Sequence, residues 1–239
     1  MNFKYLISII GTLILGTVFL YAQDFPSISP KAHLRDAGGQ EGDVFPASSF
    51  VGSAPVSGVF TANPANAEGW IANYEWRFYT DADEESPYLV RYEQDTQFTF
   101  TKAGNHRIVC YATFTRGSEK ITFTKEYWDE AGAITVTISE SKLEMPNAFS
   151  PNGDGINDIY RAKSGYQSIT EFNAYIYNRW GQKLYEWHDP AGGWDGTYKG
   201  KEVPQGVYFC LVKAKGADGR DFNIRKDVNL LRGYTEEKQ

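Results

Sequence analysis

The residues best suited to chemistry form a short run rich in Asn, Asp and Gly, between Asn152 and Asp158. Carboxylate and amide oxygens spaced around glycines are the ligands that a hard cation such as Ca²⁺ prefers. However, a calcium loop that starts at Ser150 lacks the usual first Asp and has Arg161 where a bidentate Glu is needed. We therefore predict a turn held by side-chain hydrogen bonds to the backbone. The alternative is a calcium site with the ligands Asn152, Asp154, Asn157 and Asp158.

Groups that could perform catalysis are scarce. The three histidines, His33, His106 and His188, lack the His-x-x-x-His spacing of a zinc site. The chain has no Gly-x-Ser-x-Gly motif, phosphate loop or dinucleotide fingerprint. A glycosidase pair of carboxylates needs only nearness in space, but two small domains offer no deep cleft for it. We predict no catalytic residues, no enzymatic activity and no cofactor, apart from the calcium alternative.

The overall composition narrows the class of protein. The 239 residues include 30 acidic and 24 basic side chains, and this net charge of −6 disfavours nucleic-acid binding. A hydrophobic content of 41% with 15% aromatic residues predicts a folded chain. Two cysteines exclude a disulfide scaffold, and we expect Cys110 and Cys210 to be free thiols buried in separate domains.

The first residues have the pattern of a secretory signal peptide. Lys4 is followed by an uncharged, apolar run from Tyr5 to Tyr21 and then by the small residue Ala22. We predict residues 1–22 as the signal peptide and no transmembrane span in the mature protein. An uncleaved anchor is the alternative, because Leu20 is large for its position before the cleavage site.

The mature chain is expected to contain a linker and two domains. Residues 23–46 are rich in Pro and Gly in a polar background, which predicts a flexible linker without fixed structure. Residues 23–144 carry 10 basic and 18 acidic side chains, whereas residues 145–239 carry 13 and 12. This change in charge predicts a domain boundary between residues 144 and 145.

The periodicity of the apolar residues is that of strands. Ile134, Val136 and Ile138 alternate with threonines, and no long window has the 3.6-residue period of an amphipathic helix. In residues 47–140 we count about seven strands, the last of them over 119–138. The predicted fold class is all-β, with two consecutive immunoglobulin-like β-sandwich domains.

The segments Tyr74–Phe78, Phe98–Phe100 and Gly104–Tyr111 resemble the polycystic-kidney-disease (PKD) type of sandwich domain. An acidic loop over residues 81–85 replaces the Gly-Asp-Gly turn of that family. The resemblance implies a PKD-like β-sandwich over residues 47–144. We expect Trp76 to lie in its core, between the two sheets.

The last 95 residues contain four motifs, which are Asn147–Tyr160, Ala174–Tyr185, Gly193–Gly196 and Val203–Phe209. With these motifs in this order, the chain from about Met145 to Tyr234 resembles the gliding-motility-associated C-terminal domain, which is the type B sorting domain of the type IX secretion system. The resemblance implies a recognition motif made of Phe149, Pro151, Asn152, Gly153, Asp154, Gly155, Asn157, Asp158, Asn178, Arg179, Trp180, Gly181, Trp194, Asp195, Gly196, Gly206 and Tyr208.

The residue types of these motifs also suit turns and a core. Gly181 is placed to take a positive φ in a short hairpin, and Asp195 to bond local amides in a tight turn. We favour a structural role for Trp180 and Trp194, with contact to a receptor as the alternative.

The resemblance also implies export across the inner membrane by the general route, followed by recognition at the outer membrane by the type IX machinery. A PorP/SprF-type outer-membrane protein is the implied partner. We therefore predict a non-enzymatic accessory protein at the outer membrane or cell surface, docked to such a barrel. The alternative is a surface adhesin or carbohydrate-binding module whose C-terminal domain is only a sorting signal. An adhesin would expose an aromatic patch formed by Trp70, Tyr74, Tyr79 and Tyr88.

Overall fold

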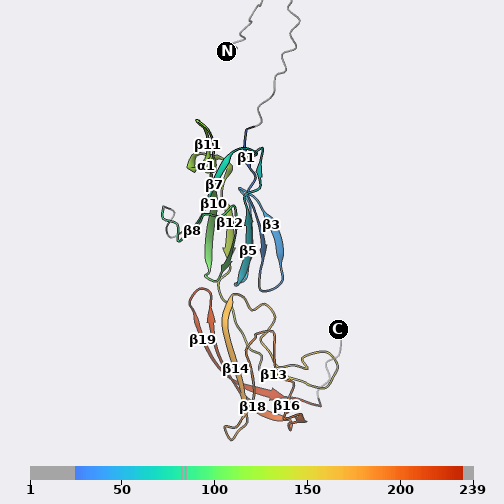
Figure 1. The fold of residues 1–239 in the computed structure, drawn as a ribbon. Coiled ribbons are helices and arrows are strands. Elements are labelled where there is room, and N and C mark those ends of the chain that lie inside the picture. Colours follow the sequence, from blue (N-terminus) through green and yellow to red (C-terminus); the bar gives the residue numbers. More distant parts are fainter. Residues whose placement is uncertain (1–24, 82, 84, 234–239) are drawn as a thin grey trace, which may run out of the picture.

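Strands formed by alternating apolar residues build two units that are stacked end to end in the computed structural model (Figure 1). The structure describes residues 25–81, 83 and 85–233. The predicted signal peptide, residues 1–22, lies outside the described residues. The all-β prediction is confirmed, since the described part of the chain contains a single short helix.

The N-terminal unit, residues 25–138, is a sandwich of two main sheets. Its elements are β1 (Ser27–Ile28), β2 (Lys31–Arg35), β3 (Glu41–Val44), β4 (Ser49–Gly52), β5 (Val56–Thr61), β6 (Pro64–Ala65), β7 (Ile71–Thr80), β8 (Leu89–Arg91), β9 (Asp95–Phe100), β10 (Gly104–Arg116), β11 (Glu119–Phe123), α1 (Lys125–Ala131) and β12 (Ile134–Ile138). One sheet has the order β3-β2-β5-β9, and the other has the order β4-β12-β10-β7-β8 with β11 on β10.

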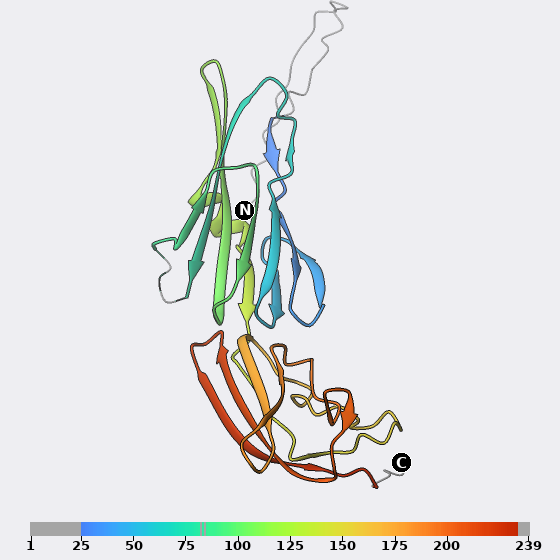
Figure 2. The same ribbon diagram turned by 60° about the horizontal axis from the view of Figure 1, so that its bottom comes forward.

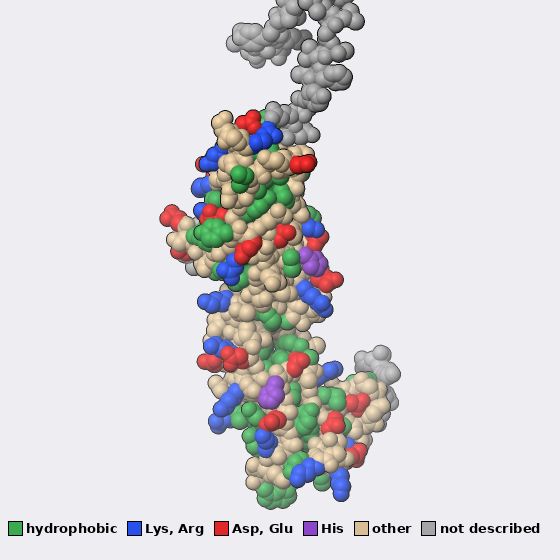
Figure 3. All heavy atoms as spheres, viewed as in Figure 1, with side chains coloured by type: hydrophobic (Ala, Val, Ile, Leu, Met, Phe, Trp, Pro, Cys, Tyr) green, Lys and Arg blue, Asp and Glu red, His purple; other side chains and the backbone are tan. Residues whose placement is uncertain are grey.

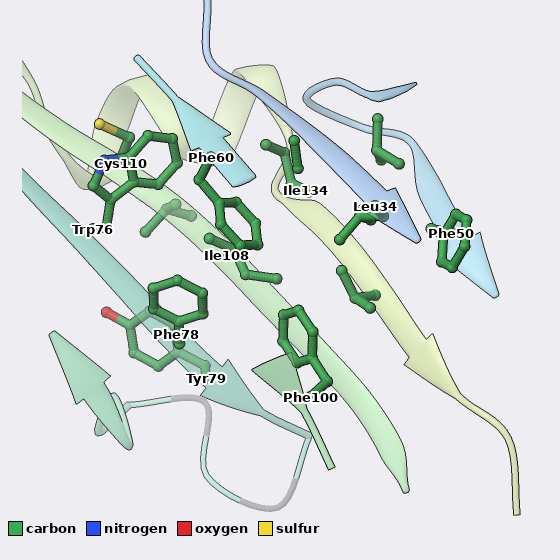
Figure 4. Packing of buried hydrophobic residues seen from close by; sticks show 14 of the residues in the cluster. Leu34, Phe50, Phe60, Trp76, Phe78, Tyr79, Phe100, Ile108, Cys110 and Ile134 are labelled. Carbon is green, nitrogen blue, oxygen red and sulfur yellow. The ribbon is translucent and has the colours of Figure 1, made fainter. Parts of the chain in front are cut away.

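Aromatic side chains from both sheets fill the space between them (Figure 4). Trp76 is fully buried, as predicted, and its indole N–H donates to the carbonyl oxygen of Gln94 at 3.1 Å. The ring of Phe60 lies 5.8 Å from that of Trp76 and 5.2 Å from that of Phe78, in tilted and edge-to-face contacts. Such contacts suit the quadrupoles of the rings and bury a large apolar area.

The predicted flexible linker over residues 23–46 is wrong where the structure describes it. Strands β2 and β3 lie in this segment and extend the four-stranded sheet, and Ala32 and Leu34 of β2 are fully buried. The glycines that indicated a linker form the hairpin turn instead: Gly39 has φ +86°, and its amide donates to Asp36 O at 3.1 Å. The segment is therefore part of the sandwich.

The predicted strand over 119–138 is also wrong in its middle, because helix α1 separates β11 from β12. Trp128 anchors this helix, since its side chain is buried and its indole N–H donates to Cys110 O at 2.9 Å. Gly132 ends the helix with φ +75°, and a Cβ there would lie 2.9 Å from the Ala47 side chain.

The C-terminal unit, residues 143–233, is built on one curved five-stranded sheet with the order β13-β19-β18-β14-β15 (Figure 2). Long loops and a two-stranded ribbon, β16-β17, cover its inner face. The strands of the unit are β13 (Ala148–Phe149), β14 (Ile169–Tyr177), β15 (Lys183–Trp187), β16 (Thr197–Tyr198), β17 (Lys201–Glu202), β18 (Gly206–Gly216) and β19 (Asp221–Leu230).

Each unit has its own buried core. The first cluster draws its members from the chain up to Ile138, with Ala217 of the C-terminal unit added, and the second cluster starts at Leu143, just before the predicted boundary. Cys110 lies in the first cluster and Cys210 in the second, both as free thiols. Burial raises the pKa of the Cys110 thiol to about 12 and that of the Cys210 thiol to about 11. Both are therefore protonated at neutral pH and serve as small apolar core residues.

Within the described residues, no helix is long and apolar enough to cross a membrane.

Candidate functional site

The aromatic residues of three sequence motifs meet in the C-terminal core. Phe149, Trp194 and Tyr208 are all buried, with ring centroids 5.3 Å apart between Phe149 and Trp194 and 5.2 Å apart between Trp194 and Tyr208. The Trp194 indole N–H donates to Thr197 O at 2.7 Å, and the Tyr208 hydroxyl donates to Pro204 O at 2.7 Å. The structural interpretation is therefore confirmed for Trp194, and these aromatic residues hold the motif loops against the sheet.

The turn after Trp194 has the predicted geometry. The Asp195 carboxylate accepts the backbone amide of Thr197 at 2.9 Å and its hydroxyl at 2.8 Å, and Gly196 has φ +79°. The guanidinium of Arg232 donates to the carbonyl oxygens of Gly196 at 2.8 Å and Pro151 at 3.4 Å.

Arg232 thus holds two motif loops together, and sequence analysis did not single it out. It also donates to Val203 O at 3.2 Å and forms an ion pair with Glu202 at 3.3 Å. Its partners lie up to 81 positions away in the chain, so no local spacing could have indicated this role.

The Asn152–Asp158 loop is an exposed turn in which Asp158 accepts backbone amides. Its carboxylate oxygens accept the N–H groups of Gly153 at 2.7 Å, Gly155 at 2.8 Å and Asn152 at 3.0 Å. The bonds from Gly153 and Gly155 hold the pKa of the Asp158 carboxyl below its ordinary value. Asp154 likewise accepts the Ile156 amide at 2.8 Å. This geometry is that of the predicted turn, in which the loop's own amides occupy carboxylate oxygens that a cation would need.

Trp180 differs from the structural prediction, because its side chain is 80% exposed and makes no part of the core. It lies in the turn between β14 and β15, where the Asn178 side-chain oxygen accepts the amides of Trp180 and Gln182, both at 3.0 Å. Gly181 takes the predicted positive φ, at +77°. The turn is therefore held by Asn178 and Gly181, while the indole itself points to solvent.

The exposed indole borders a shallow groove of about 240 Å³ at the same end of the unit. Its apolar lining comes from Leu184, Tyr198, Val203, Pro204 and Val207. A guanidinium, that of Arg179, lies 5.6 Å from the Trp180 ring centroid, and the Lys199 ammonium lies 5.3 Å from the Tyr198 ring centroid. Gly206 also lines the groove, at the start of β18.

This end of the molecule is distant from the N-terminal unit (Figure 1). Strand β14 starts at Ile169 beside the first unit and ends at Tyr177, and eight steps of ~3.3 Å correspond to roughly 26 Å. Elsewhere on the face shown in Figure 3, basic and acidic side chains are interspersed. The Trp180 turn and its groove are therefore accessible while the first unit is in place.

The aromatic patch expected of an adhesin is not formed. Tyr74 and Tyr79 are buried in the first core. Trp70 is partly buried beneath the guanidinium of Arg116, which lies 4.4 Å from its ring centroid. Tyr88 is 43% exposed, and its hydroxyl bonds His106 Nδ1 at 3.0 Å. Of the four aromatics, only Tyr88 is thus exposed.

Comparison with protein families gives a match over the second unit. The family model of the CHU_C Type IX secretion signal domain matches residues 143–224. The chain thus carries a type IX secretion signal domain in its C-terminal part. This signal implies contact with the type IX machinery and export across the outer membrane to the cell surface. No curated protein matches the chain.

Solved structures give only distant likenesses. Dimeric latent PorU from Porphyromonas gingivalis is 12% identical with a TM-score of 0.25, and the match covers 88% of this chain and 20% of that chain. A tetra-tandem repeat in the extending region of a large adhesion protein is 10% identical with a TM-score of 0.27, covering 87% and 68%. The immunoglobulin domains 1–5 of Sidekick-1 are 11% identical with a TM-score of 0.23, covering 85% and 38%.

Proposed function

We propose that this chain is a non-enzymatic accessory protein of the outer membrane or cell surface. A signal peptide takes it across the inner membrane, and its C-terminal unit acts as a type B, gliding-motility-associated sorting domain for the type IX machinery. The same unit then docks to a PorP/SprF-type outer-membrane barrel, which retains the PKD-like first unit at the membrane.

The observation that carries the docking proposal is the exposure of Trp180 in a turn that its neighbours hold in place. An indole that is 80% exposed adds no core packing, yet Asn178 and Gly181 hold its backbone in one conformation. Tryptophan and arginine are the residues most enriched in the centres of protein interfaces, and Arg179 stands beside Trp180. The groove next to the indole gives a partner side chain a place to bind.

The adhesin alternative is less well supported, because it requires a contiguous aromatic surface on the first unit. Of the four aromatic residues expected in that surface, Tyr74 and Tyr79 are buried, and the hydroxyl of Tyr88 is hydrogen-bonded to His106. The proposal of retention beside a membrane partner is therefore favoured over the adhesin.

The test is Trp180→Ala in the full chain, expressed in a bacterium that has the type IX system and its PorP/SprF-type proteins. We expect the variant to keep its melting temperature and to lose cross-linking to the barrel protein in outer membranes. The matched control is Tyr92→Ala, which removes an aromatic side chain that is 73% exposed on the first unit. This control should cross-link as the wild type does. Unchanged cross-linking of the Trp180 variant would disprove docking through this turn.

A further inference from the structure

The turn between β18 and β19 of the C-terminal unit inserts into the end of the N-terminal unit. Ala217, in this turn, is only 9% exposed and belongs to the buried cluster of the first unit. Its carbonyl oxygen accepts the amide of Ala103 at 3.0 Å, and its own amide donates to Ser168 O at 2.9 Å. The first bond crosses between the units, whereas the second fixes the turn within the C-terminal unit. The two units are therefore joined by apolar packing and by a backbone hydrogen bond.

Ser168 adds a second connection at the same place. It is 2% exposed and has φ +49°, a conformation that is uncommon for a residue other than glycine. Its hydroxyl oxygen accepts the amide of Ala54 of the first unit at 3.1 Å, across the contact between the two units, which we call the joint. A polar side chain buried in a strained conformation persists only where its surroundings stabilise it, and here the stabilising partner is the other unit.

The segment between the units is bonded on both sides. Ser139 donates its amide to Gly52 O at 3.0 Å, and Lys142 exchanges two backbone bonds with Gln167, at 3.0 and 2.9 Å. The Ser141 hydroxyl donates to Asp218 Oδ1 at 2.6 Å, and its amide donates to Asp218 Oδ2 at 3.1 Å. A flexible linker would leave these backbone groups to water.

The approach of the segment to β18 is also close. A Cβ at Gly216 would lie 2.2 Å from Ser141 Oγ, a distance that no side chain could accept without moving the segment. The residue at this position must therefore be glycine for the joint to close as it does.

We propose that Ser168, Ala217 and Asp218 form an intramolecular docking site for the end of the first unit and its connecting segment, so that both units act as one body. The first unit contributes the backbone amides of Ala54 and Ala103, and the connecting segment contributes Ser141. The C-terminal unit is then a permanent structural part of the protein, and residues 139–147 are not a processing site. The proposed retention of the first unit requires that the C-terminal unit stay attached, and this inference goes beyond it by identifying the contacts that hold the two units together.

Limited trypsin digestion of the purified mature chain tests the joint. The side chain of Lys142 is exposed but its backbone is paired, so cleavage after it requires local opening of the joint. We expect the wild type to resist cleavage there, and Ala217→Asp to be cleaved at least about tenfold faster, because a buried carboxylate cannot remain in the apolar cluster. The matched control, Ala191→Asp, introduces the same charge at an exposed alanine and should behave as the wild type does.

Ser168→Ala is the second variant, used in case Ala217→Asp does not fold. It removes one hydroxyl without adding bulk and should raise cleavage after Lys142 several-fold. Equal and rapid cleavage of the wild type and both joint variants would overturn the proposal. So would recovery from the cell surface of a protein that ends before residue 143. Loss of export or of barrel cross-linking would contradict the proposed function but would leave the digestion result unchanged, so the two failures are distinguishable.

Discussion

At the scale of single residues, two tryptophans in similar sequence settings have opposite environments. Trp180 directly precedes Gly181, and Trp194 lies two residues before Gly196, each in a turn between strand-like runs. The sequence indicates a structural role for each tryptophan. Trp194 is fully buried and bonds Thr197 O, whereas Trp180 is 80% exposed. The difference arises because the Trp194 loop folds back over the sheet onto Phe149 and Tyr208, whereas Trp180 lies in the turn of the β14–β15 hairpin and its indole stays outside the core.

The first prediction concerns these two residues. Trp194→Ala should lower the free energy of unfolding by ~3–5 kcal/mol, because a large aromatic side chain is removed from a packed core. Trp180→Ala should change it by no more than about 0.5 kcal/mol, as is usual for exposed positions. Urea denaturation of both variants in the full chain measures the contrast. Equal losses would contradict the environments described for the two indoles.

A second prediction concerns the Asn152–Asp158 loop. Asp158→Ala should lower the melting temperature, because three backbone amides lose their acceptor. Millimolar Ca²⁺ should shift the melting temperature of the wild type by less than about 2 degrees, since a true ligand at a hundredfold excess over its Kd would shift it by roughly 10 degrees or more. A large shift that a chelator reverses, and that is lost in Asp154→Ala, would establish the calcium alternative.

At the scale of elements, alternation of apolar residues predicted most strands, and Pro and Gly content misled the prediction at one point. Residues 23–46 contain short runs such as 31–35, which are too short to be distinguished from a polar linker by composition alone. Their burial depends on pairing with β5, which is distant in sequence. Helix α1 was missed for a similar reason, since it is short and Trp128 is the buried residue that anchors it. In both places tertiary packing decided the local structure.

The third prediction tests whether β2 belongs to the sandwich. Leu34→Ala should cost ~2–5 kcal/mol, because Leu34 is fully buried between the sheets. The control is Val59→Ala on the paired strand β5, where the side chain is 48% exposed and the cost should not exceed about 1 kcal/mol. Chemical denaturation gives both values. A negligible effect of Leu34→Ala would show that residues 25–46 form a linker after all.

At the scale of the whole molecule, the sequence indicated two units and the family of the second, but not how they are joined. The motif residues Phe149, Trp194 and Tyr208 could be identified because their spacing matches a known domain. The residues Ser168, Ala217 and Asp218 have no such pattern. The side-chain bonds that Ser168 makes to Ala54 and Asp218 makes to Ser141 span 114 and 77 positions of the chain. Long-range pairs of this kind depend on the finished arrangement of both units.

The last prediction is the pH dependence of this joint. The hydrogen bond from Ser141 is the main cause that lowers the pKa of Asp218 to about 2 from its ordinary value of 3.8. The charged groups around the Asp218 carboxylate are the guanidinium of Arg220, 4.0 Å from Oδ2, and the side chains of Lys102, Glu171 and Lys215, which line the groove that Asp218 also lines. A carboxylate with a depressed pKa stabilises the folded state fully above its unfolded pKa and loses this contribution as the pH falls through the folded value.

The wild-type protein should therefore have a higher melting temperature than Asp218→Asn at pH 5 to 7. This gap in melting temperature should narrow as the pH falls from about 4 toward 2. Scanning calorimetry of both proteins over this range measures the gap. In a Ser141→Ala background the gap should be smaller at every pH, because the main donor to the carboxylate is gone. A gap that widens on acidification would mean that Asp218 is held protonated at the joint, and would contradict the ionised carboxylate on which the connection between the two units depends.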